Sequence, residues 1–153
     1  MTLSVQREVE SRDTLEQIPS DEELRAWVEE AQIDPILSIE VNLRIVDKDE
    51  IQKLNQLYRG IDKPTNVLSF ASDVPDGSGI HLLGDMVICA DIVAEEARKF
   101  GKRLIDRWAH MVVHGCLHIQ GFDHEQPDER EFMEAEEIRV LKGLGIHQPY
   151  QVN

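Results

Sequence analysis

The chain has 153 residues, 41% of them hydrophobic and 30% charged, as in an ordinary globular protein with room for one core. Its net charge of −14 argues against generic nucleic-acid binding, which usually requires an excess of basic residues. No stretch approaches the roughly 18 consecutive apolar residues of a membrane span, and the first residues do not resemble a signal peptide. Cys89 and Cys116 lie in apolar segments and do not indicate a disulfide framework, so we expect a cytoplasmic protein.

The charges are unevenly distributed along the chain. Residues 1–31 and 123–139 are strongly acidic, whereas residues 98–118 carry Arg98, Lys99, Lys102, Arg103 and Arg107 against Asp106 alone. Most of these charges are typical of solvated helix faces, although the basic stretch beside the histidines could contact a polyanion. No repeat or linker divides the sequence. We expect one domain over residues 1–153, with a mobile acidic N-terminal segment over residues 1–20.

The first predicted elements are a helix and a strand. Ser20 and Glu23 form a capping-box pattern that predicts a helix over about residues 21–32. The following segment, "ILSIEVNLRIVD", alternates strictly between apolar and polar residues. This alternation predicts a strand with one buried and one solvated face.

A second helix is predicted in "DKDEIQKLNQLYRG". There Ile51, Leu54, Leu57 and Tyr58 recur at helical spacing and form one apolar face, and Gly60 is suited to end the helix.

The rest of the chain alternates between short strands and longer helices. "NVLSFAS" predicts a strand followed by the turn-rich "SDVPDGSG", and "HLLGDMVICA" predicts a largely buried strand. We expect a helix over about residues 91–100, capped by its first residue, and another over 103–119. The last helix should run from Pro127 to just before Gly143 or Gly145. Because strands and helices mix without a regular β-α-β alternation, the sequence predicts an α+β fold.

Four of the six histidines lie in "HMVVHGCLHIQGFDHE" (110–125). His114 and His118 are four positions apart, on one face of the predicted helix and within reach of a shared ion. His124 can join them only if the helix breaks, and Gly121 can adopt the conformation that reverses the chain. Three nitrogen ligands with one open position are typical of catalytic zinc, so we predict one Zn²⁺ at this site.

The remaining histidines and Cys116 receive weaker assignments. His110 lies about 12 Å along the helix axis from His118, too far to share an ion with it, so it either supports the site or faces the substrate, or is a satisfied helix histidine. Cys116 points away from the His114/His118 face and is predicted to belong to the core. His81 and His147 receive no role.

The residue after His114 is Gly115. In proteases of the H-E-x-x-H type, a glutamate at this position acts as the general base. A hydrolase without that carboxylate must rely on the metal-activated water, and phosphodiester cleavage tolerates this better than amide hydrolysis. A zinc protease is therefore the less favoured alternative.

Basic residues also mark the segment "LYRGIDKPTNVLSF" (57–70). Arg59 could offer a bidentate fork to a phosphate, with Lys63 four positions later in a loop. Composition alone favours a simpler interpretation, a surface arginine at a helix C-terminus.

Three segments together, "YRGIDKPTNVLSF", "LGDMVIC" and "WAHMVVHGCLHIQGFDH", strongly resemble the bacterial YbeY family over about residues 36–142. The resemblance implies a zinc-dependent, single-strand-specific endoribonuclease that acts in 16S rRNA 3′-end maturation and ribosome quality control. It also implies an α+β fold in which helices, one of them metal-binding, flank a mixed β-sheet.

Carried over residue by residue, the metal ligands of the family fall on His114, His118 and His124, and its functional arginine falls on Arg59. The resemblance thus favours a functional role for Arg59, and we assign catalysis to Arg59 and His114. Asn66 stands where family members usually have aspartate: it either removes a working charge or caps a turn equally well.

Several further residues are candidates for supporting the site or contacting substrate or partner. The acid of the L-G-D motif falls on Asp85, in a strand end or turn; the others are His110, Asp123 and Lys63. The expected partners are single-stranded rRNA, the small ribosomal subunit and its assembly proteins, with no membrane. Besides the protease, the open alternative is a noncatalytic, metal-stabilised ribosome-assembly module.

Overall fold

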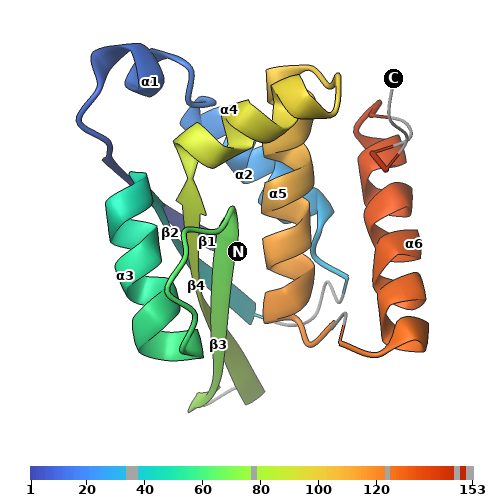
Figure 1. The fold of residues 1–153 in the computed structure, drawn as a ribbon. Helices are drawn as coiled ribbons and strands as arrows, with labels where there is room; N and C mark the ends of the chain where they lie inside the picture. The colour runs from blue at the N-terminus through green and yellow to red at the C-terminus, as the bar shows by residue number, and fades with distance from the viewer. Residues whose placement is uncertain (34–37, 77–78, 123–124, 147–148, 151–153) are drawn as a thin grey trace.

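The computed structural model describes residues 1–33, 38–76, 79–122, 125–146 and 149–150 (Figure 1). The described residues form four strands and six helices, and the last three elements are all helices. In order they are β1 (Thr2–Glu8), α1 (Arg12–Glu16), α2 (Asp21–Glu30), β2 (Ser38–Val46), α3 (Lys48–Arg59), β3 (Val67–Asp76), β4 (Gly79–Cys89), α4 (Ala90–Lys99), α5 (Leu104–Ile119) and α6 (Pro127–Gly143).

The strands form one four-stranded sheet in the order β1-β2-β4-β3. β2 pairs in parallel with both β1 and β4, whereas β3 pairs with β4 in the antiparallel direction. The sheet is therefore mixed, and the predicted α+β fold is confirmed. The turn predicted in "SDVPDGSG" is wrong in its first half, because β3 continues to Asp76. Pro75 is tolerated there since β3 is an edge strand.

The N-terminal residues belong to the sheet. Residues 2–8 form the edge strand β1, which we did not predict, in place of part of the mobile segment expected over residues 1–20. Arg7 fastens this strand to the start of α2 through an ion pair with Asp21 at 2.7 Å and a hydrogen bond to the Pro19 carbonyl at 2.9 Å. The capping box of Ser20 and Glu23 is confirmed at the N-terminus of α2.

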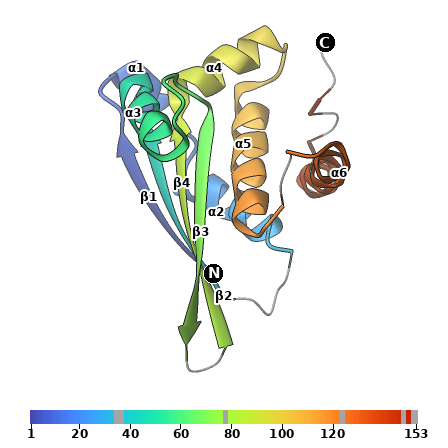
Figure 2. The same ribbon diagram turned by 60° about the horizontal axis from the view of Figure 1, so that its bottom comes forward.

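Helices cover both faces of the sheet. α5 lies against one face, where it contacts α2 and α4, and α6 packs on the outer side of α5 (Figure 2). The buried side chains that alternate along β2 join the main core on this face: Ile39, Val41, Leu43 and Ile45. α3 lies on the other face over a smaller apolar cluster that includes Ile51, Leu68 and Val87.

The predicted apolar face of α3 is covered only in part, because Leu54 packs against the smaller apolar cluster but the last turn does not. Ile51 is buried, but Leu57 and Tyr58 are 71% and 62% exposed. Asn55 is buried instead, and its side-chain amide donates to the Lys63 carbonyl at 2.8 Å. The last turn of α3 therefore presents apolar side chains to solvent.

Two glycines end the helices that carry the predicted site. Gly60 has φ +70° after α3 and Gly121 has φ +102° after α5, in the region that favours glycine, as predicted. α3 and α5 run so that their C-termini lie at the same end of the molecule (Figure 1). At the other end, α4 begins at Ala90, so Asp91 lies in its first turn and does not cap it.

None of the helices in the described part of the chain is both long enough and apolar enough to cross a membrane.

Candidate active site

A cavity of about 460 Å³ lies where the C-terminal ends of α3 and α5 meet the start of β3. Its wall is formed by Arg59 from α3, residues 65–70, His114 and His118 from α5, and Glu125. Arg59 and the two histidines lie far apart in the sequence and come from opposite faces of the sheet. The fold therefore brings one guanidinium and two imidazole side chains to one cavity.

His114 and His118 lie on successive turns of α5. Their ring centroids are 6.3 Å apart and the rings are nearly perpendicular, at 81°. Both side chains are partly exposed, in contrast to most of their neighbours on α5. This spacing is compatible with two imidazoles that converge on one ion, so the pair fits the zinc chemistry predicted from the sequence.

A buried carboxylate orients His114. Glu137, on α6, has 0% exposure, and its Oε1 accepts a hydrogen bond from Nδ1 of His114. A carboxylate at Nδ1 keeps the proton on that nitrogen, so Nε2 is the nitrogen that could ligate a metal; metal-bound histidines usually have such a support. Burial by itself would raise the pKa of Glu137, but its contacts with His110 and His114 outweigh burial and lower the pKa to about 2.

The same carboxylate connects to His110. Arg107 donates to Nδ1 of His110 at 3.1 Å, His110 Nε2 lies 3.3 Å from the Tyr150 hydroxyl, and that hydroxyl donates to Glu137. Burial lowers the pKa of His110, which favours the neutral ring that this chain of hydrogen bonds requires. His110 does not line the cavity and is linked to His114 through Glu137.

The sequence analysis did not assign Glu137 a role, although one signal was present. On α6 the buried residues Met133, Val140 and Leu141 follow helical spacing, and Glu137 occupies an otherwise apolar position in that series. A charged residue on a core-facing stripe needs a buried partner, and the nearby histidines were candidates for it.

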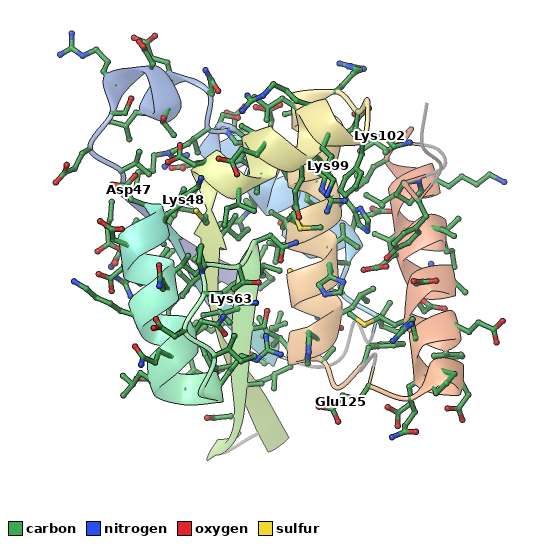
Figure 3. The ribbon with its side chains drawn as sticks, in the orientation of Figure 1. Asp47, Lys48, Lys63, Lys99, Lys102 and Glu125 are labelled. Atoms are coloured by element: carbon green, nitrogen blue, oxygen red, sulfur yellow. The ribbon has the colours of Figure 1, made fainter. Side chains whose placement is uncertain are left out.

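The third predicted ligand, His124, and its neighbour Asp123 lie outside the described residues. Glu125 follows them directly and lines the cavity, at the end of the molecule where α5 leads into α6 (Figure 3). Among the described residues, no group of three or more histidine, cysteine, aspartate or glutamate side chains is placed to hold a metal ion.

Gly115 packs tightly against the sheet. A Cβ atom at this position would lie 2.7 Å from Sδ of the fully buried Met86. The Gly115 carbonyl accepts a hydrogen bond from the Ser69 hydroxyl at 3.2 Å. The glutamate of an H-E-x-x-H motif would therefore not fit here unless Met86 moved. This packing argues further against a protease.

Asp85 and Lys63 lie away from the cavity wall. Asp85 is in the middle of β4, and not at the predicted strand end or turn; its exposed side chain accepts a hydrogen bond from Asn42 at 3.3 Å. Its neighbour Met86 faces α5, so Asp85 points to the opposite face of the sheet. Lys63 is exposed on the loop between α3 and β3 (Figure 3).

Cys116 belongs to the core, as predicted. It is buried among apolar side chains, and burial raises its pKa to about 12. A thiol that stays protonated is a poor metal ligand.

The side chain of Asn66 binds the carboxylate of Glu96, which an aspartate at position 66 would repel. Its side-chain amide donates to Glu96 at 3.2 Å, and Glu96 also pairs with Arg107 at 3.1 Å. The side-chain oxygen of Asn66 accepts a hydrogen bond from the backbone NH of Val67 at 2.7 Å. These contacts indicate a structural role for Asn66, but aspartate would not serve equally well there, because it would repel Glu96.

The lysines of the basic stretch, Lys99 and Lys102, do not lie beside His114 and His118. Lys99 and Lys102 lie at the α4 end of α5, whereas Glu125 marks the cavity end (Figure 3). The side chain of Arg107 is only 11% exposed and pairs with Glu96.

A larger hollow of about 590 Å³ lies between the end of α5 and the start of α6. It is lined by Gln120, Gly121, Phe122, Asp128, Glu129 and Phe132. Its two carboxylates would repel phosphate, and among the described residues that line it there is neither a histidine nor a basic side chain. The smaller cavity is therefore the better candidate for phosphodiester chemistry.

Comparisons with known proteins show to which family the chain belongs. A sequence model described as Endoribonuclease YbeY matches residues 6–145, so the likeness begins well before residue 36 and takes in the segment that we had placed outside it. An Endoribonuclease YbeY of Halorhodospira halophila is 50% identical over 141 residues, covering 87% of this chain and 88% of that protein. The solution structure of TM1509 from Thermotoga maritima has a TM-score of 0.51 at 29% identity and covers 94% of this chain and 92% of that one. The chain therefore belongs to the YbeY endoribonuclease family.

Proposed function

We propose that this protein is a zinc-dependent, single-strand-specific endoribonuclease that matures the 3′ end of 16S rRNA and takes part in ribosome quality control. The observation that carries the proposal is the cavity that joins Arg59 to His114 and His118. Family membership supports an activity on RNA phosphodiester bonds.

His114, His118 and His124 would hold one zinc ion. The chemistry that zinc supplies in such a site is Lewis-acid activation of water and of a phosphoryl oxygen. Glu137 keeps the His114 ring in the orientation and tautomer that leave Nε2 as the ligand atom.

Arg59 would bind the scissile phosphate. Its guanidinium is exposed, lines the cavity and offers two parallel donors to a phosphate, where it can stabilise the charge that develops during cleavage. The nucleophile is either water or the 2′-hydroxyl of the RNA. End-group analysis of the products distinguishes them, because attack by the 2′-hydroxyl leaves a 2′,3′-cyclic phosphate.

The proposed partners follow from the charge of the chain. With a net charge of −14, free RNA should bind weakly, and the small ribosomal subunit or its assembly proteins would present the substrate in the cytoplasm.

Single-turnover cleavage of a single-stranded RNA tests the proposal. We expect His118→Ala to lose both zinc and cleavage while it keeps the wild-type circular dichroism. Arg59→Glu should keep zinc and lose at least about 100-fold in cleavage, the scale seen when one donor to transition-state charge is removed. It also controls for a contaminating nuclease.

Cleavage that persists in Arg59→Glu would contradict the proposal. If His118→Ala merely unfolds, and the wild type binds zinc without cleaving RNA, the metal would have the structural role of the assembly-module alternative.

A further inference from the structure

Tyr58 lies at the edge of the candidate active site. It occupies the last turn of α3 and is 62% exposed. Its ring contacts that of Phe70, with centroids 5.1 Å apart and ring planes tilted by 56°. Phe70 is partly buried and forms part of the cavity wall. An exposed aromatic ring therefore adjoins the cavity directly.

The backbone around Tyr58 is held in place. Gly60 turns the chain at φ +70°, and Asn55 donates to the Lys63 carbonyl at 2.8 Å across that turn. Gln52 donates to the side chain of Asp62 at 3.0 Å. These hydrogen bonds hold the loop after α3 against the helix, so the ring of Tyr58 is presented from a fixed support.

Two exposed cations lie near Tyr58 in the sequence. Arg59 and Lys63 are exposed on either side of the turn, and the acidic residue between them, Asp62, accepts from Gln52. An exposed aromatic ring with adjacent cations is the usual arrangement for single-stranded nucleic acid, since bases stack on the ring and phosphates pair with the cations. A partner protein that docked by apolar contact alone would gain nothing from this charge.

We propose that Tyr58 is the platform on which one unpaired base of the substrate stacks while Arg59 holds the adjoining phosphate. The proposal rests on the endoribonuclease function proposed above and adds a physical reason for single-strand preference. A base within a duplex is paired and stacked between its neighbours, so it cannot cover the Tyr58 ring without leaving the helix.

The test compares Tyr58→Ala, Tyr58→Phe and Leu57→Ala with the wild type. Binding of a short fluorescent single-stranded RNA is followed by anisotropy at low salt, and KM and kcat are measured separately. Tyr58→Ala should weaken binding and raise KM by roughly 5- to 150-fold, the effect of losing one base–aromatic stack, with a much smaller change in kcat. Tyr58→Phe, which keeps the ring, should stay within about twofold of the wild type.

Leu57→Ala is the matched control. Leu57 is 71% exposed on the same turn, so it would matter to an apolar docking surface but not to a base stacked on Tyr58. Thermal melting of each variant separates a loss of binding from a loss of fold.

A scan of single abasic sites along the RNA locates the base. At one position, removing the base should weaken wild-type binding but add nothing to the loss already caused by Tyr58→Ala. Wild-type affinity in Tyr58→Ala, an equal loss in Leu57→Ala, or full additivity at every abasic position would each overturn the proposal.

Two further outcomes separate this proposal from the proposed function. If the wild type binds RNA through Tyr58 but does not cleave it, the endoribonuclease function fails and the platform stands. If Tyr58→Ala keeps RNA affinity and loses co-sedimentation with the small ribosomal subunit, the ring contacts a protein and the platform is overturned.

Discussion

Glu137 is a fully buried carboxylate that accepts hydrogen bonds from His114 and Tyr150 and lies 3.7 Å from Nε2 of His110. A buried charge is tolerated only when it is paired, and here the partners include a residue that lines the cavity. The stability of the α5–α6 contact and the orientation of His114 therefore depend on the same side chain.

Replacing this carboxylate with an amide tests its role in metal binding. We expect Glu137→Gln to weaken zinc affinity about 10- to 100-fold, measured by competition with a chromogenic chelator, because the neutral amide holds the His114 proton less strongly. The matched control is Glu136→Gln on the same helix, whose carboxylate pairs with Arg139 at 2.8 Å. Equal zinc affinity in the two variants would contradict the assigned role.

At this scale the sequence predicted residues that act through local spacing. His114 and His118 are four positions apart, so the helix alone places them together, whereas the cavity contact of Arg59 was expected from family resemblance. Glu137 could not be located in this way, because its contact with His114 depends on how α6 packs against α5. The sequence also could not show to which face of the sheet Asp85 points, because that depends on which face of β4 packs against α5.

At the scale of elements, the position of the histidine helix depends on two glycines. Gly84 on β4 and Gly115 on α5 leave space where the helix approaches the sheet. A Cβ at Gly84 would lie 2.7 Å from both Cδ1 and Cγ2 of Ile119, the residue after His118. The last turn of α5 therefore rests directly on the backbone of β4.

An added methyl group tests this close approach. Gly84→Ala should lower the free energy of unfolding by about 1–3 kcal/mol, the usual cost of overpacking a core, as measured by urea denaturation. Ile119→Val removes one of the clashing atoms, so the double variant should recover part of the loss. Strict additivity of the two substitutions would show that the helix does not rest on Gly84.

Element prediction succeeded where one local pattern dominated. The strict alternation along β2 and the caps of α2 and α3 were read directly from the sequence. β1 is short and carries charged residues, and it becomes a strand only by pairing with β2. The exposed end of α3 escaped prediction because helical spacing identifies an apolar stripe without showing how far the sheet covers it.

At the scale of the whole molecule, the net charge of −14 opposes binding of a polyanion such as RNA. At the cavity, Arg59 supplies a positive charge that favours it. The basic stretch over residues 98–118 does not offset this charge at the cavity, because Lys99 and Lys102 lie at the other end of α5 (Figure 3). Recognition of RNA should therefore depend on a few contacts at the site and on the presentation by the ribosome proposed above.

Filter binding of random-sequence single-stranded RNA across a salt series tests this view. We expect weak binding with a shallow salt dependence, since few phosphates are neutralised and each contributes a slope of only about −0.7. Tight binding, or a slope that indicates many phosphate contacts, would show that another surface of the protein binds RNA.

We propose above that His114, His118 and His124 hold one zinc ion beside Arg59. Elemental analysis of the untagged wild type, beside a variant with His114, His118 and His124 all replaced by alanine, tests it most directly. The account predicts about one zinc per wild-type chain and none in a variant that keeps the wild-type circular dichroism. Equal zinc content in the two proteins, or a wild type that stays metal-free in the presence of zinc, would contradict it.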